Sequence, residues 1–295
     1  MNLKNKLLAV SLIGLFILTA APYCQAQTTE TAVNKAAIEQ MIKEDFSILN
    51  GKTGTAIFDR WGEENLKALT NVSCDCKIEK FIYCNTITDC LAMIKSGRAD
   101  FMLTTDVTAA YVAERNQDIK AIIAPGELGA VMMLRASDSS LRDSFNAAIK
   151  KLKENGRIGE LEKKWIKELP VGQEPAGTKI EKTADTETVY VGVSGDMPPL
   201  DYVAADGKPA GFNVALLGEI SKLIGKNIEV VSIDSQARFA ALESKKIDVF
   251  FWIIMPTHEF VREKLKENAD EQAFYKKFTF TEPHCLVKTG LLMKK

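Results

Sequence analysis

The chain closes with FTFTEPHCLVKTGLLMKK, residues 278–295, and this stretch decides how the fold is assembled. Residues 285–293 form an apolar run with the composition of a buried strand, and the sequence ends two residues later. The backbone groups of a buried strand need hydrogen-bonding partners. Because no return strand follows, those partners have to come from earlier in the chain, and the sequence predicts that residues 285–293 thread back into the body of the protein.

The bulk composition is that of a globular protein. Hydrophobic residues make up 46% of the 295 residues and charged residues 26%, both close to the averages for soluble domains. A chain of this length forms one large domain or two lobes of roughly 100 to 150 residues each. The formal net charge of −1 offers no broad basic face, which argues against nucleic acid and anionic lipid as partners.

The N-terminal residues 1–26 have the pattern of a secretory signal peptide. Two lysines precede an apolar stretch, residues 7–18, and small residues then lead to a predicted cleavage site after Ala26. The apolar stretch is shorter than the roughly 20 residues that span a bilayer. Lipid attachment at Cys24 is the alternative, and the bulky Tyr23 before it disfavours that outcome. The pattern predicts export to the periplasm.

Four of the six cysteines fall within NVSCDCKIEKFIYCNTITDC, at Cys74, Cys76, Cys84 and Cys90. In an exported protein such a cluster predicts one or two disulfides, although sequence cannot choose the pairing. Free buried thiols are an alternative. A metal site is disfavoured because the cluster has no C-x-x-C pair and no nearby histidine. Cys285 is expected to be a buried strand residue.

Strands and helices alternate in two stretches, residues 48–168 and 188–295. The predicted strands are short and apolar, and each is followed by a helical period, which favours parallel sheets covered on both faces. The fold class is therefore α/β. Between the two stretches, residues 170–187 contain prolines, glycines and charges without apolar periodicity, which predicts a flexible linker.

Motifs that would mark an enzyme or a cofactor are absent from the sequence. Gly51-Lys52-Thr53 resembles the end of a phosphate loop, but Phe46 stands where the first glycine belongs. The only histidines, His258 and His284, lie in different segments, which excludes a multi-histidine metal centre. There is no G-x-S-x-G elbow. The sequence predicts neither catalysis nor a bound cofactor.

The second stretch carries a series of family motifs in order. They are VYVGVSGDMPPLDYVAADGKPAGFNVALLGEISKLIGKNIEVVSID (189–234), RFAALESKKIDVFFWIIMPT (238–257) and FTFTEPH (278–284). Together they resemble the opening lobe of the polar amino-acid family of bacterial extracellular solute-binding proteins, family 3. The resemblance implies a type II periplasmic binding fold, in which two α/β lobes, each a mostly parallel sheet flanked by helices, hold a ligand in the cleft between them and close by hinge motion.

The first stretch is similar to the later half of the same family. The matching segments are LNGKTGTAIF (49–58), IKSGRADFMLTTDVTAAYV (94–112) and the closing region 126–165. The halves thus stand in reverse order, as in a circular permutant. Former termini that lie close together on the surface would permit this.

Permutation implies a set of domain boundaries. Residues 48–130 correspond to the family's second lobe, 131–168 to the return crossover and closing helices, 170–187 to the linker, 188–284 to the first lobe and 285–295 to the crossover strand. Residues 285–293 are then expected beside Val131–Arg135. A monomer is favoured, and a dimer in which 188–295 completes another chain is the alternative.

The resemblance also implies ligand-binding residues. Asp106 matches the acid that accepts a ligand α-amino group, with a helix N-cap as the alternative role. The arginine that grips the α-carboxylate is replaced by Phe260, and Arg262 is offset by two positions. Asp100 and Asp248 match aspartates that precede buried strands and are expected to be structural.

Further cleft positions depart from the family pattern. Met197 and Ser235 occupy positions that usually hold aromatic residues. Arg60 could supply a replacement cation and Trp61 an apolar wall, or both could be surface residues at a helix start. Trp252 is expected either to line the cleft or to pack in the core.

We therefore expect a secreted, non-enzymatic protein that captures a small polar solute, an amino acid or a related molecule. The family implies delivery to the membrane permease of an ABC importer. The alternatives are a ligand sensor without a transport role and an enzyme similar to cyclohexadienyl dehydratase on the same scaffold.

Overall fold

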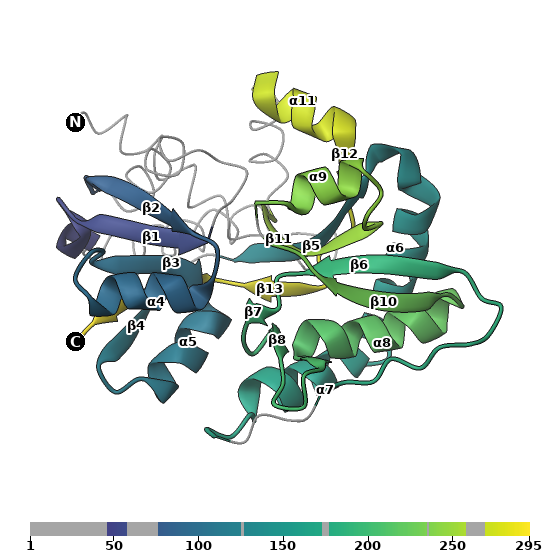
Figure 1. Ribbon diagram of the computed structural model, residues 1–295, viewed down its shortest axis with the longest axis horizontal. Helices are drawn as coiled ribbons and strands as arrows, with labels where there is room; N and C mark the ends of the chain where they lie inside the picture. The colour runs from purple at the N-terminus through teal and green to yellow at the C-terminus, as the bar shows by residue number, and fades with distance from the viewer. Residues whose placement is uncertain (1–45, 58–75, 125–126, 173–176, 235, 258–268) are drawn as a thin grey trace, which may run out of the picture.

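The structure is a computed structural model that describes the chain except residues 1–45, 58–75, 125–126, 173–176, 235 and 258–268 (Figure 1). The predicted signal peptide, with Cys24, lies outside the described residues. None of the helices that are described is both long enough and apolar enough to cross a membrane.

Sheet A has five strands in the order β2-β1-β3-β14-β4. Its strands are β1 (Thr53–Ile57), β2 (Lys80–Cys84), β3 (Phe101–Thr105), β4 (Ile119–Ile123) and β14 (Thr289–Lys294). Strand β1 is parallel to β2 and β3, whereas β14 is antiparallel to both of its neighbours. Helices α4 (Ile87–Lys95) and α5 (Asp106–Arg115) cover one face, and η1 (Phe46–Leu49) contributes to the core on the other. We call this sheet with α4 and α5 lobe A.

Sheet B has the order β10-β6-β11-β5-β12. Its strands are β5 (Leu128–Arg135), β6 (Thr188–Val193), β10 (Asn227–Ser232), β11 (Val249–Pro256) and β12 (Phe278–Phe280), with β13 (Cys285–Val287) beside β5. A small sheet of β7 (Asp196–Met197), β8 (Asp201–Val203) and β9 (Pro209–Ala210) lies next to it.

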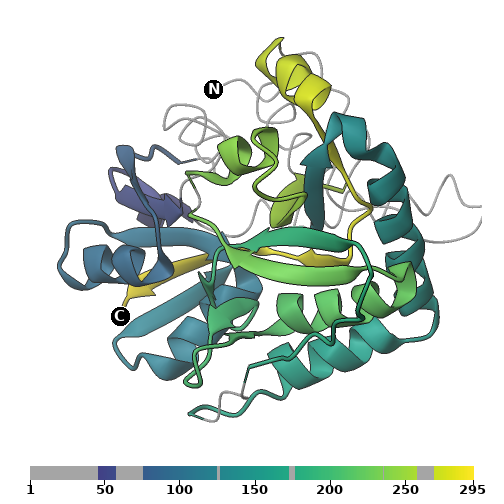
Figure 2. The same cartoon turned by 45° about the vertical axis from the view of Figure 1, so that its right-hand side comes forward.

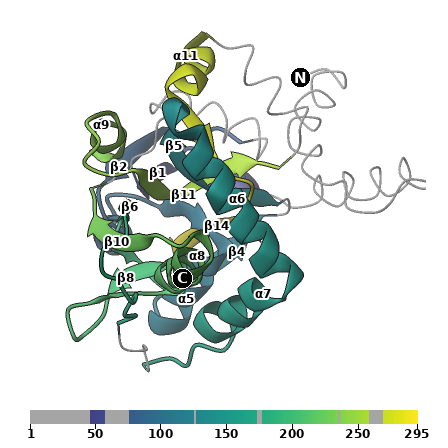
Figure 3. The same ribbon diagram turned by 90° about the vertical axis from the view of Figure 1, so that its right-hand side faces the viewer.

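Helices cover both faces of sheet B. Side by side in Figure 3 lie α6 (Ser139–Glu154), α7 (Arg157–Glu162) and α8 (Phe212–Ile224), with a π-helical turn at Lys163–Lys167 after α7. The short 3-10 turn η2 (Ala136–Asp138) precedes α6, while α9 (Arg238–Glu243) and α11 (Ala269–Lys277) pack on the opposite side. We call sheet B, the small sheet and these helices lobe B.

The two sheets share one strand order. Each runs through its second, first and third parallel strands, then an antiparallel guest strand, then its fourth strand. The guest is β14 in sheet A and β5 in sheet B. The chain runs from β4 of lobe A into β5 of lobe B, and from β13 of lobe B into β14 of lobe A, so each guest strand is an interior strand of the sheet that it enters (Figure 2). Two mostly parallel sheets flanked by helices confirm the predicted α/β class.

The C-terminal strand threads back, but not as one strand beside Val131–Arg135. Residues 285–287 pair with Leu128–Ala130 of β5, and the chain then leaves for sheet A at Lys288. At this break Lys288 is bound by Asp106 of lobe A. The Asp106 backbone N–H donates to the Lys288 carbonyl, and Asp106 Oδ1 accepts the Lys288 N–H, both at 2.9 Å. Residues 131–135 lie between β11 and β12 instead, where Arg135, Leu134 and Met133 pair with β12.

The two aspartates that were expected to be structural have equivalent roles in the two lobes. Asp100, before β3, accepts the Thr53 N–H of β1 on Oδ2 at 2.9 Å. Asp248, before β11, accepts the Tyr190 N–H of β6 on Oδ2 at 3.0 Å. Each carboxylate therefore ties the start of the third strand to the first strand of its own sheet.

Residues 177–187 of the predicted linker are docked on lobe B rather than free. The Asn227 side chain accepts the Thr183 N–H at 2.7 Å and donates to the carbonyls of Thr183 and Thr186. Ile180 packs against the lobe B core. Composition alone missed this docking because its main partner lies more than 40 residues further along the chain.

The predicted disulfides are wrong for Cys84 and Cys90, which are buried thiols that form no disulfide. Cys76 is buried as well. The sulfurs of Cys84 and Cys90 lie 3.3 and 3.4 Å from the Thr55 hydroxyl, and burial raises the pKa of Cys90 to about 12. Cys76 belongs to the core on the other face of sheet A. All three fill core positions; Cys74 lies outside the described residues.

Candidate functional site

The candidate site lies where the two lobes meet. Figure 1 shows the small β7-β8 hairpin of lobe B next to α4 and α5 of lobe A, with β13 crossing behind it. Of the predicted ligand-binding residues, Asp106 and Met197 fall in this region, and Trp252 lies in the core of lobe B. The other four, Arg60, Trp61, Ser235 and Arg262, lie outside the described residues.

The loop that carries Met197 is fixed to lobe B by the buried carboxylate of Asp201. Oδ1 accepts hydrogen bonds from the Ser194 hydroxyl and the Gly195 N–H, and Oδ2 accepts one from Asn213 Nδ2 of α8, all at 2.7 Å. Burial raises the pKa of Asp201, and these three bonds oppose that shift by stabilising the carboxylate. The loop is therefore braced at its start and against α8. Sequence reasoning missed Asp201.

Met197 lies at the contact between the lobes. Its half-buried side chain packs against the main core of lobe B and also against the α4–α5 core of lobe A. From the other side, Val107 of α5 packs against the lobe B core. The structure thus brings the segment beginning at Asp106 and the loop at Met197 to one boundary.

Asp106 is the first residue of α5, but it is not the N-cap. That position belongs to Thr105, whose hydroxyl accepts the Thr108 N–H. Asp106 Oδ1 accepts the Lys288 N–H and the Val107 N–H, both at 2.9 Å. The half-buried carboxylate therefore clamps the crossover between β13 and β14.

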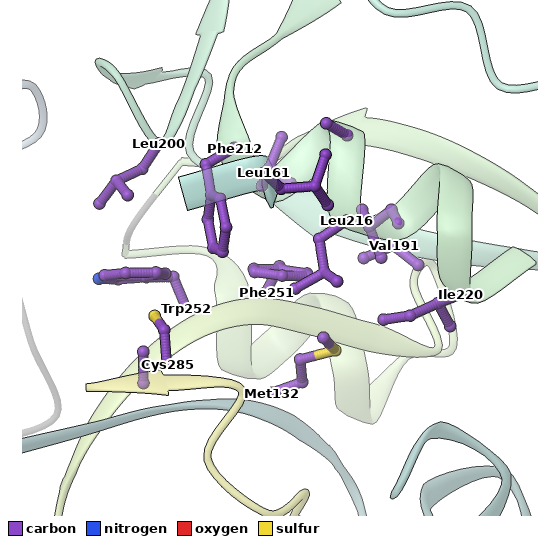
Figure 4. Close-up of a cluster of buried hydrophobic side chains, with 14 of the residues drawn as sticks. Met132, Leu161, Val191, Leu200, Phe212, Leu216, Ile220, Phe251, Trp252 and Cys285 are labelled. Carbon is purple, nitrogen blue, oxygen red and sulfur yellow. The ribbon is translucent and has the colours of Figure 1, made fainter. Parts of the chain in front are cut away.

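Trp252 is packed in the lobe B core, the alternative that the sequence left open, and its exposed fraction is 7%. It lies at a register shift in β11 between Phe251 and Ile253 and has a φ of 81°. A positive φ is rare for a bulky residue and marks local strain. Figure 4 shows its indole beside Phe212 and Phe251.

His284 sits among these same rings without a polar partner. Its ring centroid lies 4.9 Å from that of Phe251, 5.6 Å from Trp252 and 6.4 Å from Phe212. Neither ring nitrogen has a hydrogen-bond partner among the described residues. Burial, with a smaller effect from Lys153, lowers the pKa of His284 to about 3. No local sequence pattern indicates this environment, because the three rings come from α8 and β11.

Three sets of polar contacts between the lobes are found among the described residues, and one of them is the hydrogen bond from Arg115 of α5 to the Pro170 carbonyl at 3.2 Å. Asp196 of β7 accepts from the Thr88 N–H of α4 at 3.4 Å, and its other oxygen lies 3.5 Å from the Thr88 hydroxyl. Gln236 Nε2 donates to Asn85 Oδ1 at 2.8 Å. The partners in these last two contacts are 108 and 151 residues apart, beyond the reach of any local pattern.

No cluster of three or more His, Cys, Asp or Glu side chains suited to a metal ion occurs in the described part of the chain. The interlobe region offers the carboxylates of Asp106 and Asp196 and the thioether of Met197, with the apolar cores of both lobes behind them. This set suits the binding of a small polar solute through hydrogen bonds and apolar contacts.

Comparison with known proteins finds relatives for part of the chain. The arginine-binding extracellular protein ArtP of Bacillus subtilis is 35% identical over 86 residues, which cover 28% of this chain and 33% of ArtP. The L-cystine-binding protein TcyJ of Escherichia coli is 31% identical over 70 residues, which cover 24% of this chain and 26% of TcyJ. The chain thus spans about a third or less of the length of these two relatives.

Among solved structures, the ligand-binding core of GluR0 from Nostoc punctiforme, in complex with L-glutamate, aligns with 82% of this chain and 84% of its own at 11% identity and a TM-score of 0.36. Because this TM-score is low, the fold is assigned from the strand order of the two sheets and not from this likeness. A family model matches residues 189–266. Over those residues the chain matches the bacterial extracellular solute-binding proteins, family 3, which confirms the resemblance predicted from its motifs.

Proposed function

We propose that this protein captures a small polar solute, an amino acid or a related molecule, between its lobes and presents it to the permease of an ABC importer. The single observation that carries the proposal is the pair of α/β lobes linked by two guest strands, one lobe of which includes the family match at residues 189–266. Hinged lobes of this kind close around ligands. The proposed location is the periplasm, and no catalytic step is proposed.

The ligand contacts are proposed from both lobes. Asp106 Oδ1 already accepts two backbone N–H groups, which leaves Oδ2 to accept a hydrogen bond from an amino group of the solute. Met197 supplies an apolar contact at the lobe boundary. Trp252 supports the wall from the core side.

The remaining predicted positions, Arg60, Trp61, Ser235 and Arg262, complete the proposed contact set. Because Phe260 replaces the family's carboxylate-binding arginine, a solute that is gripped mainly through its amino group suits this chain best.

We also propose that the chain is a circularly permuted, monomeric form of the family fold. The strand that enters sheet A last, β14, pairs with β3 and β4, which come from the front half of the chain. Residues 177–187 lie along lobe B, as expected of a segment that joins two former ends on one lobe.

Thermal unfolding in the presence of single solutes tests the function. The 20 standard amino acids and a set of small amines without a carboxylate would be screened, and hits would be measured by calorimetry. A ligand at 100 times its Kd raises the unfolding free energy by about 2.7 kcal/mol. Asp106→Asn should weaken a genuine hit, whereas Asp143→Asn, at an exposed position on α6, should not.

Failure of every solute to stabilise the protein would contradict the proposal. Turnover of a cyclohexadienyl acid would favour the dehydratase-like alternative. Binding without stimulation of a reconstituted importer's ATPase would favour a sensor.

A further inference from the structure

Two of the polar contacts between the lobes meet at one place, the N-terminal turn of α4. Asn85 and Thr88 stand on either side of Thr86, the N-cap residue of this helix. Their partners come from two loops of lobe B, Asp196 after β6 and Gln236 after β10. Two separate lobe B loops therefore reach the same turn of lobe A.

The charge at this contact is complementary. The first N–H groups of a helix have no partner within the helix, and the positive end of the helix dipole lies there. Thr86 satisfies the Asp89 N–H with its hydroxyl, while the Thr88 N–H is met by the Asp196 carboxylate from the other lobe. The intramolecular carboxylate supplies the negative group that this helix end favours.

An apolar contact lies directly beside the polar one. Met197, the neighbour of Asp196, packs into the cores of both lobes. Both residues sit on the loop that Asp201 holds through Ser194 and Gly195, so the loop presents them from a braced position.

We propose that Asp196 and Met197 form an intrinsic latch that holds the two lobes in contact when no solute is bound. The latch concerns the same interlobe region as the proposed function and rests on it for its biological meaning, although closure itself needs no ligand. The solute-free protein is then mainly closed, and a solute gains access through the less populated open form, which lowers its apparent affinity by the open fraction.

The test measures the distance between the lobes in the full chain without added solute. Spin labels at Lys120→Cys of β4 and Lys222→Cys of α8 would report one distance across the lobes by pulsed electron resonance, because both positions are exposed. Cys74 would be replaced by Ser in all samples, since the described native thiols are buried. Refolding from denaturant and mass spectrometry of a heat extract would exclude a co-purified ligand.

The latch variant is Asp196→Ala combined with Met197→Ala. It should shift a single short distance, seen in the unmodified protein, to a broader distribution at longer distances. Asn85→Ala should produce a smaller shift in the same direction. The matched control is Asp206→Ala in the β8–β9 turn, whose carboxylate contacts only its own lobe, and it should leave the short distance unchanged.

A long, broad distribution in the unmodified protein, or an unchanged short distance in the double variant, would overturn the proposal. Unaltered near-ultraviolet circular dichroism in the double variant would show that a shift is opening and not unfolding, and Met197→Ala alone provides a milder second variant. Solute binding with an open apo state would remove the latch and leave the proposed function standing. A closed apo state together with no binding of any screened solute would support the latch and contradict the proposed function.

Discussion

The two lobes have one topology and differ in how each holds its guest strand. In lobe B the guest β5 is internal to the chain, continued on one side by α6 and on the other by the segment from β4. In lobe A the guest β14 lies between β3 and β4 and follows β13, which pairs with β5 of lobe B.

The two guest strands also differ in the side-chain contacts that hold them. In lobe B the guest strand contributes Arg135, which pairs with Asp248 at 2.8 Å and donates to the carbonyls of Leu242 and Ile247. In lobe A the equivalent aspartate, Asp100, pairs at 3.0 Å with Lys52, which is not on the guest strand. The guest of sheet A is thus held by backbone bonds and apolar packing, and lobe A should be the weaker lobe.

Removal of residues 289–295 should have the largest effect, because it deletes the strand between β3 and β4, which is the only strand that pairs with β4 in the described sheet. Burial of Leu291, Leu292 and Met293 contributes roughly 1.5–3 kcal/mol for each side chain. We expect lobe A to lose hydrogen-exchange protection while sheet B keeps it.

A full-length variant makes the same test more locally. A Cβ at Gly290 would lie 2.6 Å from the Thr105 carbonyl oxygen, so Gly290→Val should displace β14 from α5. Removal of Lys295 alone is the control. Equal protection of the two lobes in the Gly290→Val variant would contradict the asymmetry.

Acidification should weaken the protein next, through His284 at the lobe B end of the crossover. Its pKa is about 3 in the folded protein, against 6.5 as a reference value, so the unfolded chain binds the extra proton first. Stability should therefore fall as the pH drops from about 6.5 toward 3, by up to about 5 kcal/mol at roughly 1.4 kcal/mol per pH unit.

The comparison for His284 is His284→Phe, which should flatten this part of the pH profile in chemical denaturation. Asp201 acts with the opposite sign, because a carboxyl with a raised pKa contributes stability at low pH and loses it as the pH rises through its folded value. A wild-type profile that parallels the His284→Phe profile between pH 6.5 and 3 would refute the role of the histidine.

Much of the fold could be predicted from the sequence, because its strands and helices follow local patterns. Short apolar strands alternate with helices over residues 48–168 and 188–295, as predicted, in the described part of both stretches. The terminal strand was predicted to thread back, but its break at Lys288 was not. That break depends on Asp106, which is 182 residues away.

The site was much less predictable than the fold. Motif matching pointed to Met197 at the lobe boundary, where the structure has it. It gave no indication of Asp201, Asp196 or the aromatic surroundings of His284, because these depend on contacts between distant segments. The cysteine cluster misled for a related reason, since cysteines that fill a core look the same in sequence as cysteines that pair.

Removal of the basic partner of Asp248 should reduce the free energy of unfolding more than removal of the basic partner of Asp100. Arg135→Ala removes the guanidinium that pairs with Asp248 Oδ1 and donates to the Leu242 and Ile247 carbonyls in a mostly buried place, where such a loss costs about 3–5 kcal/mol. Lys52→Ala breaks a pair whose side chains are 42% and 38% exposed, worth about 0–1 kcal/mol. Urea denaturation of both variants measures the gap, and equal losses would show that the guest strand of lobe B is not specially anchored.

The smallest perturbation uses the native thiols as reporters of which lobe opens first. Cys84 and Cys90 are buried in lobe A, and Cys285 is buried beside β5. Brief pulses of a thiol reagent in mild urea, read by mass spectrometry, should modify the lobe A pair before Cys285. The reason is that the guest strand of sheet B is anchored through Arg135 to Asp248, so local opening of sheet A should cost less free energy than opening of sheet B. Earlier labelling of Cys285 would place the weaker sheet in lobe B and reverse the asymmetry between the guest strands.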